Sequence, residues 1–192
     1  MKKFLAVFVL LASPILFSGC ATVPAAKINI DAITKGKGVV VFSTESQKTS
    51  AAMCTSLSLV NGSNRKKYDG VTIVIDSPFD KSDFSGFHGN VRALTLPAGE
   101  YYLLPNILNP YFITTKAPVY KFYVHEGVIE YIGNFKLSNR NLNWSGAEYN
   151  RDYGVIRQNN PGLSGVQVRQ SMAYYAGDLS KFELRGIIWG AP

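Results

Sequence analysis

Side chains that commonly act in catalysis are scarce in this sequence of 192 residues. There are two cysteines, Cys20 and Cys54, and two histidines, His88 and His125. A serine or cysteine hydrolase needs a base beside its nucleophile, and neither histidine stands in a pattern that supplies one. The nearest approach to a nucleophile turn, Gly162-Leu163-Ser164-Gly165, has no glycine two residues after the serine. We therefore predict that the protein is not an enzyme.

A metal-binding motif is also lacking. Asp76, Asp80, Asp83 and His88 lie close together in the sequence, but they match neither the Asp-x-Asp-x-Asp-Gly loop of calcium sites nor the His-Glu-x-x-His motif of zinc sites. The stretch is interpreted as a solvated loop rich in Ser and Asp, with an oxygen-rich metal site as the alternative. No cofactor is expected.

Charged residues make up only 17% of the chain, whereas apolar residues make up 46%. That balance predicts a folded domain rather than a disordered chain. The 20 basic and 13 acidic residues include Lys2 and Lys3, and without these two the net charge is 18 − 13, or +5. A mildly basic chain with no nucleic-acid motif suits a surface of anionic lipid or cell-wall polymer better than nucleic acid.

Long apolar runs are absent except at the N-terminus, where Phe4 to Phe17 follows Lys2 and Lys3. This run fits a secretory signal of about 7–15 apolar residues and is shorter than the roughly 20 that span a bilayer. It ends at Phe17-Ser18-Gly19-Cys20. The order of basic, apolar and small residues before a cysteine resembles the signal of bacterial lipoprotein precursors, with Phe17 in place of the usual Leu. The resemblance implies that Cys20 is acylated and becomes the first residue after cleavage.

This resemblance divides the chain into a signal peptide (1–19), a tether (20–37) and a single domain (38–192). Two or more acyl chains hold a protein stably at a membrane, and the modification of this family supplies more than one. Ala21 replaces the Asp that retains many lipoproteins at the inner membrane, so in a Gram-negative organism we expect the periplasmic face of the outer membrane. With Cys20 acylated, Cys54 has no partner for an intrachain disulfide and is interpreted as a small buried residue.

From Val39 onward, short β-type runs alternate with turn residues. Val39–Phe42, Ser56–Val60 and Val71–Ile75 are β-branched or alternating runs, and each is predicted to be a strand. Leu94–Leu104 reads as a hairpin that turns at Pro97-Ala98-Gly99. The tether residues Ile28, Ile30 and Ile33 are predicted to form a first strand or to dock on the domain.

A second hairpin is predicted to turn at Glu126-Gly127. In its first strand, alternation places Tyr120, Phe122 and Val124 on one face and Lys121, Tyr123 and His125 on the other. In its return strand, it places Ile129, Tyr131, Phe135 and Leu137 opposite Glu130, Asn134 and Lys136. Residues 90–137 resemble envelope lipoproteins with transthyretin-like or carboxypeptidase-regulatory-like β-sandwich domains. The predicted fold class is mainly β: an antiparallel β-sandwich with one short helix.

The helix is predicted between Tyr149 and Pro161, because Tyr149, Tyr153 and Ile156 share one helical face. Asn150 is expected to cap its start, Pro161 to end it, and the helix to pack on the sandwich edge. Beyond it, Val166-Gln167-Val168 and Ile187-Ile188-Trp189 are candidate strands.

Two groups of residues are candidates for contact with a ligand or partner. Loop aromatics form the first group, which comprises Tyr111, Phe112 and Trp144. Arg65, Lys66 and Lys67 form the second group, at the tip of the turn between Asn61 and Gly70. They either contact phosphates of lipid or cell-wall polymer or keep a hairpin soluble.

Taken together, these features predict a lipid-anchored cell-envelope protein that acts as a non-catalytic interaction or structural module. A cell-wall glycan-binding module is the alternative, and an envelope enzyme comes third. The expected partners are the membrane, through the lipid, and an envelope protein or glycan.

Overall fold

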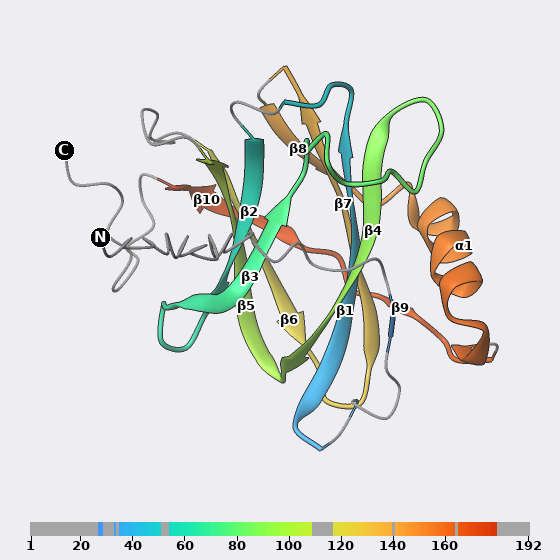
Figure 1. Cartoon of the computed structure of the whole chain (residues 1–192). Coiled ribbons are helices and arrows are strands. Elements are labelled where there is room, and N and C mark those ends of the chain that lie inside the picture. Colours follow the sequence, from blue (N-terminus) through green and yellow to red (C-terminus); the bar gives the residue numbers. More distant parts are fainter. Residues whose placement is uncertain are drawn as a thin grey trace, which may run out of the picture.

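The computed structural model describes residues 27–28, 33, 35–50, 54–108, 117–139, 141–163 and 165–179 (Figure 1). The predicted lipidation site, Cys20, and the predicted contact residues Tyr111 and Phe112 lie outside these ranges. So do Ser164 and the candidate strand at 187–189.

The described strands form two sheets, called here sheet I and sheet II. Sheet I contains, in order, β4 (His88–Pro97), β1 (Lys37–Ser46), β7 (Ile129–Ser138) and β8 (Asn141–Ser145), with β9 (Arg169–Gln170) paired to β7. Sheet II contains, in order, β10 (Tyr174–Asp178), β6 (Pro118–Val124), β5 (Gly99–Leu108), β2 (Cys54–Asn61) and β3 (Lys67–Val74). One α-helix, α1 (Tyr149–Asn159), is followed by a 3₁₀ turn, η2 (Pro161–Leu163). This arrangement confirms a mainly β, sandwich-like fold with one short helix.

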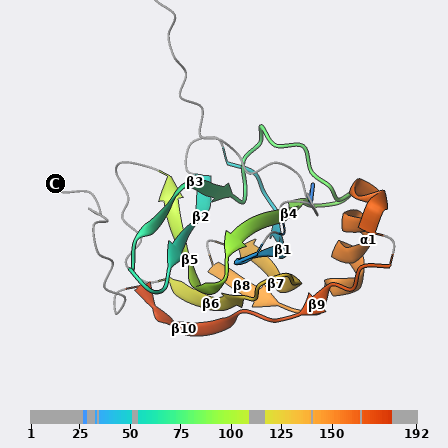
Figure 2. The ribbon, with the colours of Figure 1, turned by 90° about the horizontal axis from the view of Figure 1, so that it is seen from below.

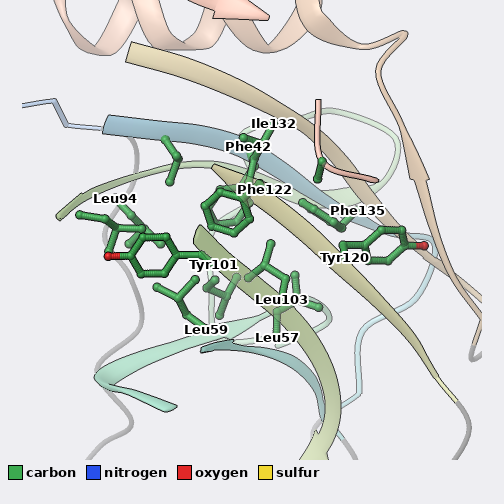
Figure 3. Packing of buried hydrophobic residues seen from close by; sticks show 14 of the residues in the cluster. Phe42, Leu57, Leu59, Leu94, Tyr101, Leu103, Tyr120, Phe122, Ile132 and Phe135 are labelled. Atoms are coloured by element: carbon green, nitrogen blue, oxygen red, sulfur yellow. The ribbon is translucent and has the colours of Figure 1, made fainter. Parts of the chain in front are cut away.

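The molecule has three layers, with sheet I between sheet II and α1 (Figure 2). The main core lies between the sheets, where aromatic and aliphatic side chains of both sheets meet (Figure 3). Its central members are Phe42, Leu57, Leu59, Tyr101, Leu103, Phe122 and Phe135, all of them fully or almost fully buried. A second core lies between sheet I and α1 and includes Val39, Val41, Tyr131 and Ile156.

Strand β1 is apolar on both faces because both of its faces are covered. Val40 and Phe42 point into the core between the sheets, and Val39 and Val41 point toward α1. A central strand buried on two sides needs a continuous apolar run rather than an alternating one. Its neighbours also differ in direction, since β1 runs antiparallel to β4 but parallel to β7.

The strands predicted between residues 39 and 137 are present, but two of the predicted hairpins are not. Strand β4 pairs with β1 in sheet I, whereas β5 pairs with β2 and β6 in sheet II. Likewise β6 belongs to sheet II and β7 to sheet I. The turns at Pro97–Gly99 and Glu126–Gly127 therefore connect the two sheets instead of joining paired strands. The turn between β2 and β3 differs from these two, because the strands that it joins are paired as a hairpin.

The predicted facing of β7 is wrong for its first half. Ile129 and Tyr131 point toward α1, whereas Phe135 and Leu137 point into the core between the sheets. The pairing of β7 with β1 shifts register between Tyr131 and Asn134. Gly133 lies in this bulge with φ +119°. One extra residue inverts the alternation beyond it.

Helix α1 forms where predicted but differs in two details. Residue Glu148 precedes its first turn without a side-chain cap, so Asn150 does not cap the start. The helix covers the outer face of sheet I rather than an edge, because Ile156 packs against the outward residues of β1 and β7 (Figure 2). The candidate strand 166–168 is also wrong: the strand β9 begins at Arg169.

The N-terminal segment docks on the domain, which was one of the two alternatives predicted for it. Ile28 and Ile33 pack against the core under α1. The backbone N–H of Ile28 donates to Oδ1 of Asn160 at 2.7 Å. Ile30 lies outside the described residues.

Candidate binding face

The outer face of sheet II carries a group of tyrosines and charged residues; one of them, Tyr102, is buried in a small apolar cluster with Val60, Leu104 and Val119, and the others stay at least partly exposed. Alternation along β6 turns Tyr120 and Phe122 into the core, as predicted, and leaves Lys121 and Tyr123 outside. On β5 the same alternation leaves Glu100 and Tyr102 outside, and β10 adds Tyr174 beside Lys121. We call this group the tyrosine face; it comprises Tyr102, Tyr123, Tyr174, Lys121, Glu100 and Arg65.

The Glu100 carboxylate is the centre of the tyrosine face. Its Oε1 accepts a hydrogen bond from the Tyr102 hydroxyl at 2.5 Å. Its Oε2 accepts one from the Tyr123 hydroxyl at 3.2 Å and pairs with Nζ of Lys121 at 2.5 Å. Three groups from two neighbouring strands are thus fixed by one carboxylate.

These contacts keep Glu100 and Lys121 charged. Burial raises the pKa of the Glu100 carboxyl, but the hydrogen bonds from Lys121, Tyr102 and Tyr123 outweigh it and hold that pKa below its ordinary value. The hydrogen bond to Glu100, followed by that to Tyr123, raises the pKa of Lys121. The pair is therefore ionised throughout the physiological pH range.

Lys121 is also surrounded by aromatic rings. Its Nζ lies 5.7, 5.1 and 5.9 Å from the ring centres of Tyr102, Tyr123 and Tyr174. A cation within about 6 Å of a ring is attracted by the electron density of the ring face. The lysine thereby helps to orient the exposed rings of Tyr123 and Tyr174, whereas the ring of Tyr102 is already held by burial.

The turn between β2 and β3 brings Arg65 onto this face. The guanidinium carbon of Arg65 lies 4.8 Å from the ring centre of Tyr102. Arg65 has φ +55°, a left-handed conformation that a non-glycine residue rarely adopts, and its N–H donates to the carbonyl of Asn61 at 3.0 Å. Gly62 lies against Glu100, where a Cβ atom would meet the Glu100 side chain at 2.7 Å. The turn thus requires glycine at position 62 to pack on this face.

Tyr123 and Tyr174 keep 41% and 45% of their surface exposed. Fixed tyrosines that offer an apolar ring and a polar hydroxyl are typical anchors of binding surfaces, because little side-chain entropy is lost on binding. The charged groups beside them are already paired within the face. The arrangement therefore suits recognition of a surface by stacking and hydrogen bonding rather than bond-breaking chemistry.

Trp144, predicted as a loop aromatic, lies in strand β8 and serves the fold. Its ring packs against the main core, and its Nε1–H donates to the carbonyl of Ile132 at 2.9 Å. Gly133 lies directly against this ring: a Cβ atom at that position would be 2.1 Å from Nε1. The short strand β8 continues through Asn143-Trp144-Ser145, a stretch whose polar residues favour a loop when only the sequence is considered.

The predicted basic cluster separates in the structure. Arg65 joins the tyrosine face, as described above. Lys66 is exposed in the turn, and its backbone N–H donates to Asn64 Oδ1 at 2.9 Å. Lys67 begins β3. Arg65 is thus the predicted basic residue that lies over the ring of Tyr102.

A buried polar cluster joins α1 to sheet I. Oδ2 of Asp152, which is completely buried, accepts hydrogen bonds from Ser43 at 2.5 Å and from Tyr131 at 2.6 Å. Its Oδ1 accepts one from Nε of Arg151 at 2.8 Å, and Arg151 also pairs with Glu45 at 3.2 Å. Burial and the neighbouring Asp152 raise the pKa of Tyr131. Because these groups satisfy one another away from solvent, the cluster holds the helix on the sheet.

A second buried carboxylate lies where β6 and β7 meet. The Glu130 side chain is fully buried and accepts hydrogen bonds from the backbone N–H of His125 at 2.9 Å and from Arg169. Nδ1 of His125 lies 2.9 Å from Glu130 Oε1. Through Glu130, the turn at His125 is linked to Arg169 of β9. This ion pair adds to the pairing of β9 with β7, which covers two residues.

The aspartates of the 76–88 stretch have other partners than a metal ion. Asp76 accepts from the backbone N–H of Thr55 at 2.6 Å, and Asp83 accepts from that of Val91 at 2.9 Å. Asp80 pairs with Arg92 at 3.3 Å. Across the described residues, no group of three or more His, Cys, Asp or Glu side chains is arranged to hold a metal ion.

The tyrosine face was only partly visible in the sequence. Alternation along β6 correctly placed Lys121 and Tyr123 outside. It gave no sign that β10 pairs with β6, which is what brings Tyr174 to Lys121. In the described part of the chain, no helix is both long and apolar enough to cross a membrane. Comparison of the chain with protein-family models, curated proteins and solved structures gives no match.

Proposed function

We propose that this protein is a bacterial lipoprotein, held at the cell envelope by acylated Cys20, that acts as a non-catalytic interaction module through its tyrosine face. The transthyretin-like likeness of residues 90–137 belongs to this proposal and is consistent with a sandwich that carries a binding surface. In a Gram-negative cell the expected place is the periplasmic face of the outer membrane.

Support for the anchor comes from the N-terminal sequence. A basic start, one apolar run and Phe17-Ser18-Gly19-Cys20 follow one another in the order of a lipoprotein signal. A net charge of 18 − 13 = +5 after removal of Lys2 and Lys3 favours a position near anionic headgroups.

The observation that carries the proposed role is the exposure of Tyr123 and Tyr174 on a preorganised surface. Lys121 lies against both rings and Glu100 accepts a hydrogen bond from the Tyr123 hydroxyl, so binding costs less conformational entropy than it would for free side chains. A protein partner is expected to cover these rings and to place its own polar groups near the tyrosine hydroxyls.

The test is photo-crosslinking of the full lipidated protein in its native membranes. A photoreactive residue at position 174 should give a discrete adduct with one envelope protein. The matched control position is Phe79, which is 84% exposed but lies in the loop between β3 and β4. Adducts that are the same from both positions, or that are absent from position 174, would contradict the proposal.

A second candidate is binding of cell-wall glycan, which the same two exposed rings favour because tyrosines stack on sugar faces. If each ring contributes about 1 kcal/mol, replacing both Tyr123 and Tyr174 by Ala weakens retention on purified peptidoglycan about 30-fold. Tyr175→Ala is the control, since Tyr175 is 58% exposed on the same strand but bonds to Asp178 instead. Trp144→Ala is unsuitable here, because its indole holds β8 on β7. Equal retention of the double variant and the wild type excludes this candidate.

A further inference from the structure

Asn160 fixes the N-terminal segment to the end of α1. Its Nδ2 donates to the carbonyl of Ile156 at 2.8 Å, which caps the helix, and its Oδ1 accepts from the N–H of Ile28 at 2.7 Å. The Asn160 side chain is buried, and Ile28 itself packs on the core beneath the helix. The place where the tether joins the body is therefore defined: it is the C-terminal end of α1, beside η2.

The tether that leads from this point to the lipid is short. Cys20 and Ile28 are 28 − 20 = 8 residues apart. Eight residues span at most about 26–29 Å when fully extended. Strand β1 alone, with 10 residues, is about 33 Å long, so the tether is shorter than the body it holds.

The surface around this junction is basic. Lys27 precedes the junction and is exposed. Arg157, in the last turn of α1, is exposed too, and its carbonyl accepts the backbone N–H of Asn160 at 3.3 Å. The acidic residue of α1, Asp152, is buried and paired with Arg151. The charges presented here are thus complementary to anionic phospholipid headgroups.

We propose that the surface formed by Lys27, Arg157 and η2 lies against the phospholipid bilayer. The short tether holds this surface at the headgroups, and its cations attract anionic lipid. Sheet II is the layer farthest from α1, so the tyrosine face points away from the membrane and is open to a partner (Figure 2). This inference rests on acylation of Cys20, which is part of the proposed function.

The test measures the distance of two labelled positions from the bilayer. The full lipidated protein, with Cys54→Ala, receives a single fluorophore at Gln158→Cys in one sample and at Asn64→Cys in the other. Both positions are exposed; Gln158 lies in the last turn of α1 and Asn64 in the turn beside the tyrosine face. The vesicles contain phosphatidylethanolamine and phosphatidylglycerol, with a nitroxide quencher on a fraction of the headgroups.

Quenching at position 158 should be several-fold stronger than at position 64. A flexible Gly/Ser spacer of about 20 residues inserted after Ala21 adds a root-mean-square length of about 25 Å to the tether and should bring the two values together. Arg157→Glu should lower quenching at position 158 on these anionic vesicles, whereas Lys66→Glu, the same charge change far from the junction, should not.

Two different results would overturn two different statements. Equal quenching at positions 158 and 64, in a protein that floats with the vesicles, would overturn the orientation and leave the anchor intact. A spacer that leaves the quenching at positions 158 and 64 unchanged would also overturn the orientation and leave the anchor intact. A protein that does not float with the vesicles, and whose N-terminal mass lacks acyl chains, would overturn the lipid anchor itself and the orientation with it.

Discussion

Asp152 shows how a single buried carboxylate can fix a helix. The side chain is out of contact with solvent, and an unpaired charge there would cost several kcal/mol. Ser43, Tyr131 and Arg151 satisfy both of its oxygens. The hydroxyls come from β1 and β7, so the carboxylate on α1 is bonded to the two central strands of sheet I at once.

Tyr131→Phe is expected to destabilise the protein by about 1.5–3 kcal/mol, because it removes a hydrogen bond to a buried charge while keeping the ring. Urea-induced unfolding followed by circular dichroism measures this difference. Tyr175→Phe, which removes an exposed hydroxyl bonded to Asp178, is the control and should change the free energy of unfolding by less than about 0.5 kcal/mol. Equal effects of the two variants would mean that the hydrogen bond from Tyr131 to Asp152 does not add to the free energy of unfolding.

Glu130 makes stability depend on pH. Burial raises the pKa of its carboxyl, but hydrogen bonds from Arg169, His125 and Ser171 outweigh it, so the folded-state pKa is below the ordinary value of 4.5. A carboxyl with a lowered pKa contributes stability above its unfolded pKa, and that contribution is lost as the pH falls through the folded pKa.

We therefore expect Glu130→Gln to lower the free energy of unfolding by about 2 kcal/mol at neutral pH, since Arg169 and His125 are half-exposed and can be hydrated instead. The difference from the wild type should shrink as the pH falls below about 4.5, where the native carboxyl also becomes protonated. Unfolding measured across this range tests both points. A difference that stays constant down to low pH would show that the charge of Glu130 is not the cause.

For single residues, the sequence predicted which face of a strand a side chain occupies better than it predicted what that side chain does. Alternation placed Lys121 and Tyr123 outside correctly. The Asn, Ser and Gly around Trp144 favour a contact residue in a loop, whereas its indole is bonded to Ile132 across the β7–β8 pair. Which side chains meet across strands depends on the pairing of strands distant in the sequence, and local patterns do not contain that information.

Among the strands, β7 depends on a bulge that only glycine permits. Gly133 has φ +119°, and its Cα faces the ring of Trp144. Gly177, in the bulge of β10, has φ +125°, but a Cβ atom there would meet nothing within 4 Å. The two glycines thus share a backbone conformation and differ in their surroundings.

Gly133→Ala is expected to cost about 2–5 kcal/mol, the sum of backbone strain and a Cβ atom 2.1 Å from Trp144 Nε1. Gly177→Ala should cost only the strain, about 1–2 kcal/mol. Chemical denaturation gives both values, and tryptophan fluorescence of the native state should change only in the first variant. If the two costs are equal, the contact with Trp144 does not contribute.

The elements themselves were predictable, but their connections were not. Runs such as Val39–Phe42 and the 3.6-residue spacing of Tyr149, Tyr153 and Ile156 indicated strand and helix correctly. Pro97–Gly99 forms a tight turn in either case, whether the next strand pairs with the previous one or enters the other sheet. Turn residues determine that the chain reverses, and the partner of each strand is decided by the packing of the two cores.

For the molecule as a whole, the proposed function gives different tasks to the two sides of the layered fold. Helix α1 and the docked segment at Ile28 cover sheet I, while sheet II leaves Tyr123 and Tyr174 exposed. In the proposed function, an anchor joined beside α1 and a binding surface on the opposite layer suit a protein that is held at a membrane and meets partners in the space beyond it. The proposed anchoring depends on the chemistry of one residue, Cys20.

Cys20→Ala is expected to abolish both acylation and cleavage, because the peptidase of this pathway acts on the acylated cysteine. Each buried CH₂ contributes about 0.8 kcal/mol, so the several acyl chains of the proposed modification would hold the wild-type protein stably. Incorporation of labelled palmitate and the mass of the N-terminal peptide are the measurements. Cys54→Ala, the only other cysteine change that the chain offers, should retain the label and still lose residues 1–19. Label that persists in Cys20→Ala, or that disappears in Cys54→Ala, would place the lipid elsewhere and remove the basis for the membrane-facing orientation of α1.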